Sequence, residues 1–129
     1  MVIAADAPGW RAPGVRRFAR LLHKNSNALV VVPDLARGDT WYGDPDPAKR
    51  AGDKKFAEWQ KGHPATRVAA DAAAVGVALR ERGATRVGVV GVGTGANAVA
   101  ALLGETDKNE KKKSDDTRET ADVGVILCP

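Results

Sequence analysis

Short apolar runs alternate with longer amphipathic stretches along most of the chain. Each apolar run ends where a loop signal begins, as strands of a parallel sheet do. The four runs are residues 2–5, 28–32, 86–90 and 123–127. The stretches between them have the apolar spacing of helices. The predicted helices are residues 15–24, 66–82 and 94–103, with Gly83 as the cap that ends the second of them.

This β-α-β-α-β-α-β order predicts an α/β fold, a three-layer α/β sandwich with a parallel sheet. Length and composition fit a single domain over residues 1–129, because 43% of the residues are hydrophobic and 28% are charged. A sheet of four strands would leave its two edges uncovered. Such edges favour self-association with other chains.

Two long connections interrupt the alternation. Residues 35–64 carry Trp41, Tyr42, Phe56 and Trp59 among Gly, Pro and Asp. They predict a surface excursion with anchoring aromatic side chains at the carboxyl end of a strand, the side on which ligands bind in open α/β sheets. Residues 105–120 are dominated by charges without an apolar face and predict a flexible, solvated insertion.

Charge, cysteine content and hydropathy exclude several classes of protein. The formal charge of +4 is spread among acidic residues without a basic stripe interleaved with aromatics, so no nucleic-acid partner is expected. A signal-like start and a long uncharged apolar run are both missing, so we expect a cytoplasmic protein without a membrane partner. Cys128 is the single cysteine, and no Cys/His cluster has metal-ligand spacing, so neither a metal nor a cofactor is expected.

The most informative stretch is VGVVGVGTGANAVAALL, which begins at Val87 and predicts a strand, a tight glycine turn and a helix. Its residues 91–95, GVGTG, have the spacing of a nucleophile elbow, Gly-x-nucleophile-x-Gly, with Gly93 in the place of the nucleophile. The flanking glycines permit strand and helix to approach closely. The elbow residue commonly has a strained positive φ, which glycine adopts without penalty. One step further, Thr94 should turn its hydroxyl toward the helix and its amide toward a developing oxyanion.

The same turn also fits a second template. Gly91, Gly93 and Ala96 match the dinucleotide fingerprint GxGxxG/A, in which amides at a helix N-terminus hold a pyrophosphate. That template expects an acid about twenty residues further on, near the end of the next strand. Asp115 and Asp116 have this separation but lie in the charged segment. A nucleotide- or anion-binding module that uses the GxGxGA turn therefore stays open as an alternative.

The order of motifs around the turn resembles a known family. The elements that carry the resemblance are IAADAPGW with RRFARLL, VVVPDLARGDTW, FAEWQKGHP, ALRERGATRVGVVG and ADVGVILCP. In this order they are similar to the dienelactone hydrolase family of α/β hydrolases, and the PDL-x-RGD-x-W element is the most specific match. The resemblance spans nearly the whole chain and corresponds to the middle of that fold, so a partial α/β-hydrolase domain is expected.

The resemblance implies hydrolysis of a small ester or lactone, but the residues that carry the chemistry are not matched. Family members have a cysteine in a Gly-Phe-Cys-x-Gly turn, where this chain has Gly93. The family's triad Asp and His follow later strands, beyond the segment that ADVGVILCP resembles. Loss of a triad nucleophile lowers turnover about a million-fold. We therefore expect a hydrolase-like domain without covalent catalysis.

Several side chains and amides remain candidates for a ligand site. Asp6 matches an acid that lies beside the nucleophile in the family, and the amides of Ala7 and Thr94 are the expected oxyanion-type donors. Arg37, with Arg11, would pair with a substrate carboxylate, as the family's acidic lactones require. The expected pocket residues are Asp6, Arg37 and Trp41.

The two histidines are not expected to act as bases. His23 lies among Arg and Lys in the first predicted helix, which predicts an exposed imidazole. His63, before Pro64 in the long connection, would at most touch a ligand.

Overall fold

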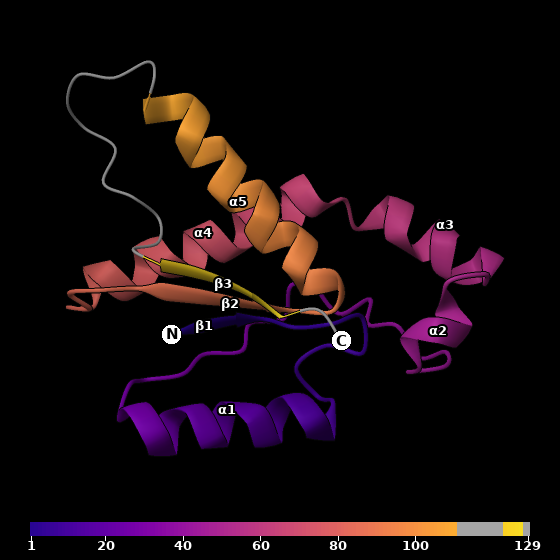
Figure 1. Cartoon of the computed structure of the whole chain (residues 1–129), viewed down its shortest axis with the longest axis horizontal. Helices are drawn as coiled ribbons and strands as arrows, with labels where there is room; N and C mark the ends of the chain where they lie inside the picture. The colour runs from indigo at the N-terminus through magenta and orange to yellow at the C-terminus, as the bar shows by residue number, and fades with distance from the viewer. Residues whose placement is uncertain (111–122, 128–129) are drawn as a thin grey trace.

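A computed structural model describes residues 1–110 and 123–127, and it forms a parallel sheet flanked by helices (Figure 1). The strands are β1 (Val2–Ala4), β2 (Gly88–Val92) and β3 (Val123–Leu127), in the order β1-β2-β3. The helices are α1 (Pro13–Ser26), α2 (Pro47–Arg50), α3 (Lys54–Gly62), α4 (Ala65–Glu81) and α5 (Thr94–Glu110). Mixed helices and a parallel sheet agree with the α/β class predicted from the sequence.

The expected second strand, residues 28–32, is reduced to a single bridge between Val31 and Val2. Val31 donates its amide to the Met1 carbonyl at 2.8 Å, and its carbonyl accepts from Ile3 at the same distance. Pro33, which has no N–H, cannot continue the ladder, and β1 offers only three residues for pairing. The prediction of a full strand here is wrong, and this side of β1 is only partly covered.

The other elements fall close to their predicted places. β2 begins two residues later than expected. Its ladders begin at Gly88, which pairs with Val123 of β3, and at Val89, which pairs with Val2 of β1. α4 ends as predicted at a glycine with positive φ: Gly83 has φ +97° and donates its amide to Arg80. α5 continues to Glu110, so its last turns overlap the expected charged insertion at 105–120, and residues 111–120 of that insertion lie outside the described residues.

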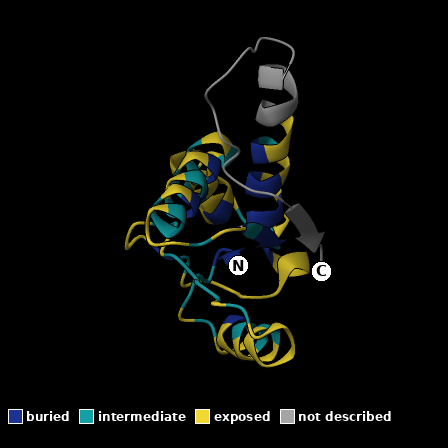
Figure 2. Cartoon of the chain, turned by 90° about the vertical axis from the view of Figure 1, so that its left-hand side faces the viewer, coloured by how far each residue is buried: buried dark blue, intermediate teal, exposed yellow. Residues whose placement is uncertain are grey.

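α4 and α5 pack over one face of the sheet, whereas α1 lies on the other side (Figure 1). Small side chains line the buried stripe of α4, so this helix can approach α5 closely. α1 buries only Val15 and is otherwise largely exposed (Figure 2). The core therefore lies between the sheet and the α4–α5 pair. Its buried residues are Val2, Ala4, Ala69, Val87, Val89, Ala98, Val99 and Leu102.

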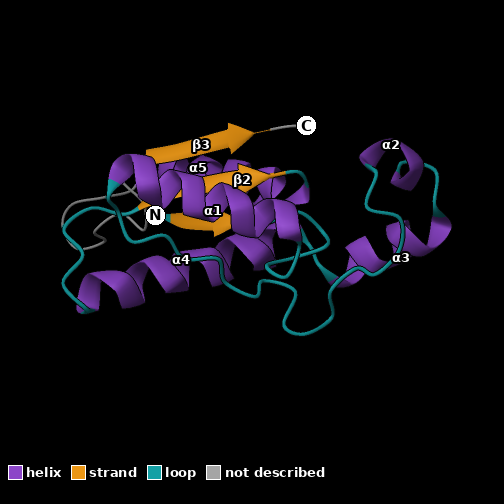
Figure 3. Ribbon diagram, turned by 90° about the horizontal axis from the view of Figure 1, so that it is seen from below, coloured by secondary structure: helices purple, strands orange, loops and turns teal. Residues whose placement is uncertain are grey.

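The long connection before α4 folds into α2 and α3, beyond the carboxyl ends of the strands (Figure 3). The two short helices begin at side-chain caps, since Asp46 and Asp53 accept hydrogen bonds from amides in the first turns. The rings of Trp41 and Phe56 meet edge to face with centroids 5.1 Å apart, and Trp59 stacks on Phe56 at 5.7 Å. Tyr42, expected to be an anchor as well, is 78% exposed. Three of the four aromatic residues thus hold this connection together.

The turn between β2 and α5 depends on two close backbone approaches. A β-carbon on Gly95 would overlap the carbonyl oxygen of Ala4 at the end of β1. A β-carbon on Gly91 would lie 2.6 Å from the Ala96 Cα. These glycines let the first turn of α5 sit against the strand ends, as expected from the spacing, and so fix where the turn points.

Substitution of Gly95 by alanine should therefore destabilise the fold, whereas the same change at Gly104 should not. Overpacking against the backbone predicts that Gly95→Ala lowers the free energy of unfolding by about 1–3 kcal/mol. Gly104 is also in α5 but has open space around it, so Gly104→Ala should raise stability by about 0.5–1 kcal/mol through helix propensity alone. Urea denaturation of both variants measures the difference, and equal effects would contradict the close approach.

Candidate functional site

The turn at Gly93 has the backbone conformation expected of an elbow. Gly93 follows β2, precedes α5 and has φ +56°, which confirms the positive φ predicted for this position. Glycine adopts this conformation without the steric cost that a β-carbon brings. The turn is therefore formed, but it projects no side chain.

The space above Gly93 is filled by Asp6, which lies just beyond the end of β1. A β-carbon built on Gly93 would overlap Cγ and Oδ1 of the Asp6 carboxyl group. The place where an elbow side chain would begin is therefore occupied by a carboxylate from a neighbouring strand end.

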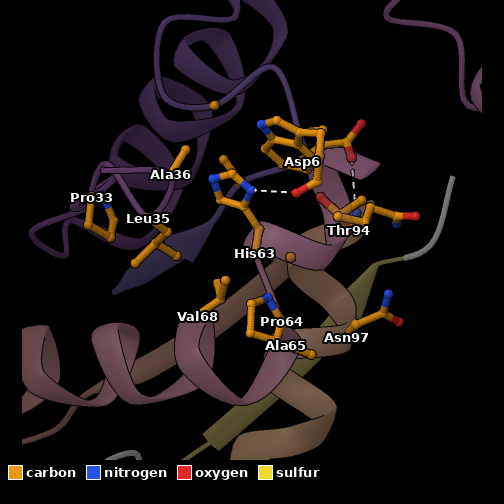
Figure 4. Close-up of a pocket in the computed structure, with 16 residues that line it drawn as sticks. Asp6, Pro33, Leu35, Ala36, His63, Pro64, Ala65, Val68, Thr94 and Asn97 are labelled. Carbon is orange, nitrogen blue, oxygen red and sulfur yellow. Dashed lines mark hydrogen bonds between the residues drawn. The ribbon is translucent and has the colours of Figure 1, made fainter. Parts of the chain in front are cut away.

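Two strong donors hold this carboxylate in place. Oδ1 of Asp6 accepts a hydrogen bond from the Thr94 amide at 3.0 Å (Figure 4), and Oδ2 accepts one from Nη2 of Arg50 at 2.6 Å. The Arg50 side chain is only 3% exposed, and its guanidinium lies over the Phe56 ring, 5.0 Å from the centroid. The connection that contains α2 and α3 thus places the buried guanidinium of Arg50 beside the end of β1.

These contacts determine the charge of the site. Burial of the Asp6 carboxyl favours its neutral form. The hydrogen bond from Arg50, those from the amides of Thr94 and Ala7, and the charge of Arg50 outweigh burial and hold the pKa of Asp6 below its usual value of 3.8. Asp6 is therefore ionised at neutral pH. The amides of Ala7 and Thr94 were the expected donors to an oxyanion. Both donate instead to the carboxylate of Asp6.

A cavity of about 230 Å³ opens beside this carboxylate (Figure 4). Its walls come from the end of β1, the segment after Val31, the C-terminal part of α3 and the first turns of α4 and α5. Asp6, Thr94 and Asn97 lie toward one side, and apolar residues form much of the remainder. The apolar lining residues are Ala5, Ala7, Pro33, Leu35, Ala36, Trp59, Pro64, Ala65 and Val68.

His63 forms part of this cavity wall and is tethered at both ring nitrogens. Nδ1 lies 2.7 Å from the Trp59 carbonyl oxygen, and Nε2 lies 3.5 Å from Oδ2 of Asp39. The imidazole also stacks on the Trp59 ring with centroids 4.1 Å apart. His63 thus lines the cavity, where it would contact a bound ligand. Its two nitrogens already face oxygen atoms of the protein.

Two of the three expected pocket residues do not line the cavity. Arg37 is turned to α4, where Nε and Nη2 donate to the two carboxylate oxygens of Asp71 at 3.0 and 2.7 Å. Trp41 packs behind the wall against Phe56 and Trp59. Of the expected set, only Asp6 reaches the cavity, because carboxylate and aromatic partners within the fold hold the other two.

The remaining candidates lie away from the cavity lining. Arg11 stacks over the Trp10 ring, 5.0 Å from the centroid. His23 is exposed on α1, as expected, with Nδ1 2.8 Å from the Ala28 carbonyl oxygen.

Arg50 is the functional residue that sequence reasoning missed. It ends a four-residue helix in a polar connection, where an arginine is usually solvated, and no local pattern marks its burial. Its Nε and Nη1 atoms are buried without a hydrogen-bond partner. A second cavity of about 210 Å³ lies against Arg50, Phe56 and Gly93, so Asp6 borders a space on each side.

Neither a metal site nor a membrane span is evident within residues 1–110 and 123–127. No three His, Cys, Asp or Glu residues gather there as metal ligands, and no helix there has the length and apolarity to cross a bilayer. No family model matches the chain, and comparisons with curated proteins and with solved structures find no match.

The ionised Asp6 should make stability depend on acid. Because its pKa is lower in the folded chain than its usual 3.8, its contribution is complete above about pH 4 and is lost as the pH falls through the folded-state pKa. The Asp6→Asn variant should lack this component, so the stability difference between wild type and variant should shrink on acidification below about pH 4. Urea unfolding between pH 2 and pH 7, as rough limits, measures it. A difference that stays constant over this range would contradict the assignment.

Proposed function

We propose that the chain is an α/β-hydrolase-like domain, resembling the dienelactone hydrolase family, that binds a small molecule and does not carry out covalent catalysis. The observation that carries the proposal is the Asp6 carboxylate above Gly93, held by Arg50 and the Thr94 amide. An acyl-transfer enzyme needs a nucleophile and empty oxyanion donors at this point. Here the nucleophile position has no side chain, and an internal anion takes the donors.

The fold supports the hydrolase part of the proposal. A parallel sheet, a strand–glycine turn–helix unit with positive φ, and helices on both sides are features of a partial three-layer sandwich of this kind (Figure 1). The cavity lies at the carboxyl ends of the strands, where α/β proteins bind ligands. A small ester or lactone bound there would meet no nucleophile at Gly93.

The alternative, a nucleotide- or anion-binding module, has one observation in its favour. The Thr94 amide at the start of α5 does hold an anion, as the GxGxGA turn would require. That anion is Asp6, so a phosphate would have to displace a carboxylate that is also paired with buried Arg50. Saturable binding of NAD, ATP or phosphate with a dissociation constant below about 100 μM would favour this alternative.

Wild-type protein should not accelerate the release of nitrophenolate from p-nitrophenyl acetate through an acyl intermediate, so no burst is expected. A fluorophosphonate should label no residue of the Gly93 turn, because no described hydrogen bond joins the Thr94 hydroxyl to a base, and both ring nitrogens of His63 in the same cavity already face protein oxygens. The chain has one cysteine, Cys128, so any iodoacetamide adduct must be mapped by peptide mass spectrometry before it is interpreted. A stoichiometric burst with an acyl adduct mapped to this chain would overturn the proposal.

Restoring a hydroxyl at the elbow should fail for a steric reason. Gly93→Ser should cost about 2 kcal/mol or more of stability, since it adds strain at positive φ and an overlap with Asp6. Asp6→Gly removes the overlap, so the double variant should be less destabilised than the sum of the single variants by about 1 kcal/mol.

Gly83→Ser is the matched control for this cycle. Gly83 also has a positive φ but has open space around the position of a β-carbon. Its combination with Asp6→Gly should be additive in urea denaturation. Additive behaviour of the Gly93→Ser and Asp6→Gly pair would show instead that the two sites do not compete for space.

A further inference from the structure

The charge distribution around the 230 Å³ cavity limits what it can bind. Asp6 is the ionised group at its side, and none of the described residues that line it is an arginine or a lysine. Arg37 and Arg50, from the connection before α4, are directed elsewhere. Arg37 is paired with Asp71, and Arg50 approaches Asp6 from the second cavity.

We propose that this cavity takes an uncharged, largely apolar small molecule that carries one hydrogen-bond donor, and that it discriminates against carboxylates. This inference rests on the proposed ligand-binding function and names its ligand class. It departs from the expectation that Arg37 and Arg11 hold a substrate carboxylate, since neither lines the cavity.

Desolvation is the first reason why an anion is disfavoured. A carboxylate that enters an apolar cavity loses its hydration and needs a cation or several donors in return. The Thr94 amide is already bonded to Asp6, and the side-chain amides of Gln60 and Asn97, which also line the cavity, carry no positive charge to balance an anion. The Asp6 carboxylate itself repels the incoming charge, and Arg50 offsets this repulsion only from the far side of that carboxylate.

Hydrogen-bond capacity explains why a neutral donor is favoured. Each carboxylate oxygen has about two acceptor positions. Asp6 accepts from Thr94 at Oδ1, from Arg50 at Oδ2 and from the Ala7 amide, so about one of its roughly four acceptor positions remains for a ligand. A hydroxyl or an amide N–H at the edge of an apolar ligand fits this requirement. The rest of such a ligand would contact Leu35 and Val68.

The test compares two probes of similar size that differ in charge, 2-phenylethanol and phenylacetate, with the full chain at neutral pH. We expect the alcohol to bind about tenfold tighter or more, because phenylacetate loses its hydration in the cavity and meets the Asp6 carboxylate with no cation on that side. Amide chemical shifts should move around Leu35, Ala65 and Val68, which are cavity residues from two separate segments. Intrinsic tryptophan fluorescence, to which Trp59 in the cavity wall contributes beside Trp10 and Trp41, gives an independent measure of affinity.

Two substitutions on α4 separate cavity binding from general surface effects. Val68→Phe fills the cavity and should abolish binding of the alcohol, whereas Val77→Phe, on the same helix at a 45% exposed position, should leave it unchanged. Asp6→Asn removes the repelling charge while Arg50 stays, so it should raise the affinity for phenylacetate relative to the alcohol. Both α4 variants are checked for folding by circular dichroism.

Three outcomes would overturn the inference. They are equal or tighter binding of phenylacetate by the wild type, binding of the alcohol that Val68→Phe does not weaken, and no binding of either probe. An acyl burst with p-nitrophenyl acetate would separately show that the chain carries out covalent catalysis. That result does not depend on which probe binds.

Discussion

The site depends on one interaction, the clamp that holds the Asp6 carboxylate between buried Arg50 and the amide of Thr94. It joins three parts of the chain that are distant in sequence: the end of β1, the helical excursion and the first turn of α5. A buried charge pair contributes little net stability compared with an apolar replacement, but loss of one partner leaves an uncompensated charge. The clamp therefore fixes the relative positions of these segments more than it adds to the stability of the core.

Much of the fold could be predicted from local patterns. The three long helices and three of the four strands follow from apolar periodicity and from glycine punctuation such as Gly83. The positive φ of Gly93 followed from the spacing of the GVGTG turn alone. The prediction of a strand at residues 28–32 was wrong although this apolar, β-branched run before Pro33 has the composition of a strand. The number of ladder hydrogen bonds depends also on the partner strand, and β1 has only three residues.

The site was less predictable because its chemistry comes from long-range pairing. Asp6 was a candidate because its segment resembles one of the dienelactone hydrolase family in which an acid lies beside the nucleophile. Arg37 and Arg50 look alike in sequence, as arginines in a polar connection, yet Arg37 is 64% exposed beside Asp71 and Arg50 is buried beside Asp6. Which carboxylate each arginine meets is decided by how α2, α3 and α4 pack. No local spacing encodes that choice.

One steric constraint links Gly93 and Asp6, because a side chain at Gly93 and the Asp6 carboxylate would occupy the same space. With a β-carbon at Gly93, the carboxylate could not stay where the Thr94 amide and Arg50 hold it, because the two groups would overlap. With the carboxylate in place, the two amides suited to an oxyanion are occupied at neutral pH. A side chain at Gly93 would thus have to displace the Asp6 carboxylate, at the cost of its hydrogen bonds to Arg50 and to the Thr94 amide. The geometry fits the proposed binding site, with a largely apolar cavity on the Asp6 side of the Asp6–Arg50 pair and no side chain at Gly93.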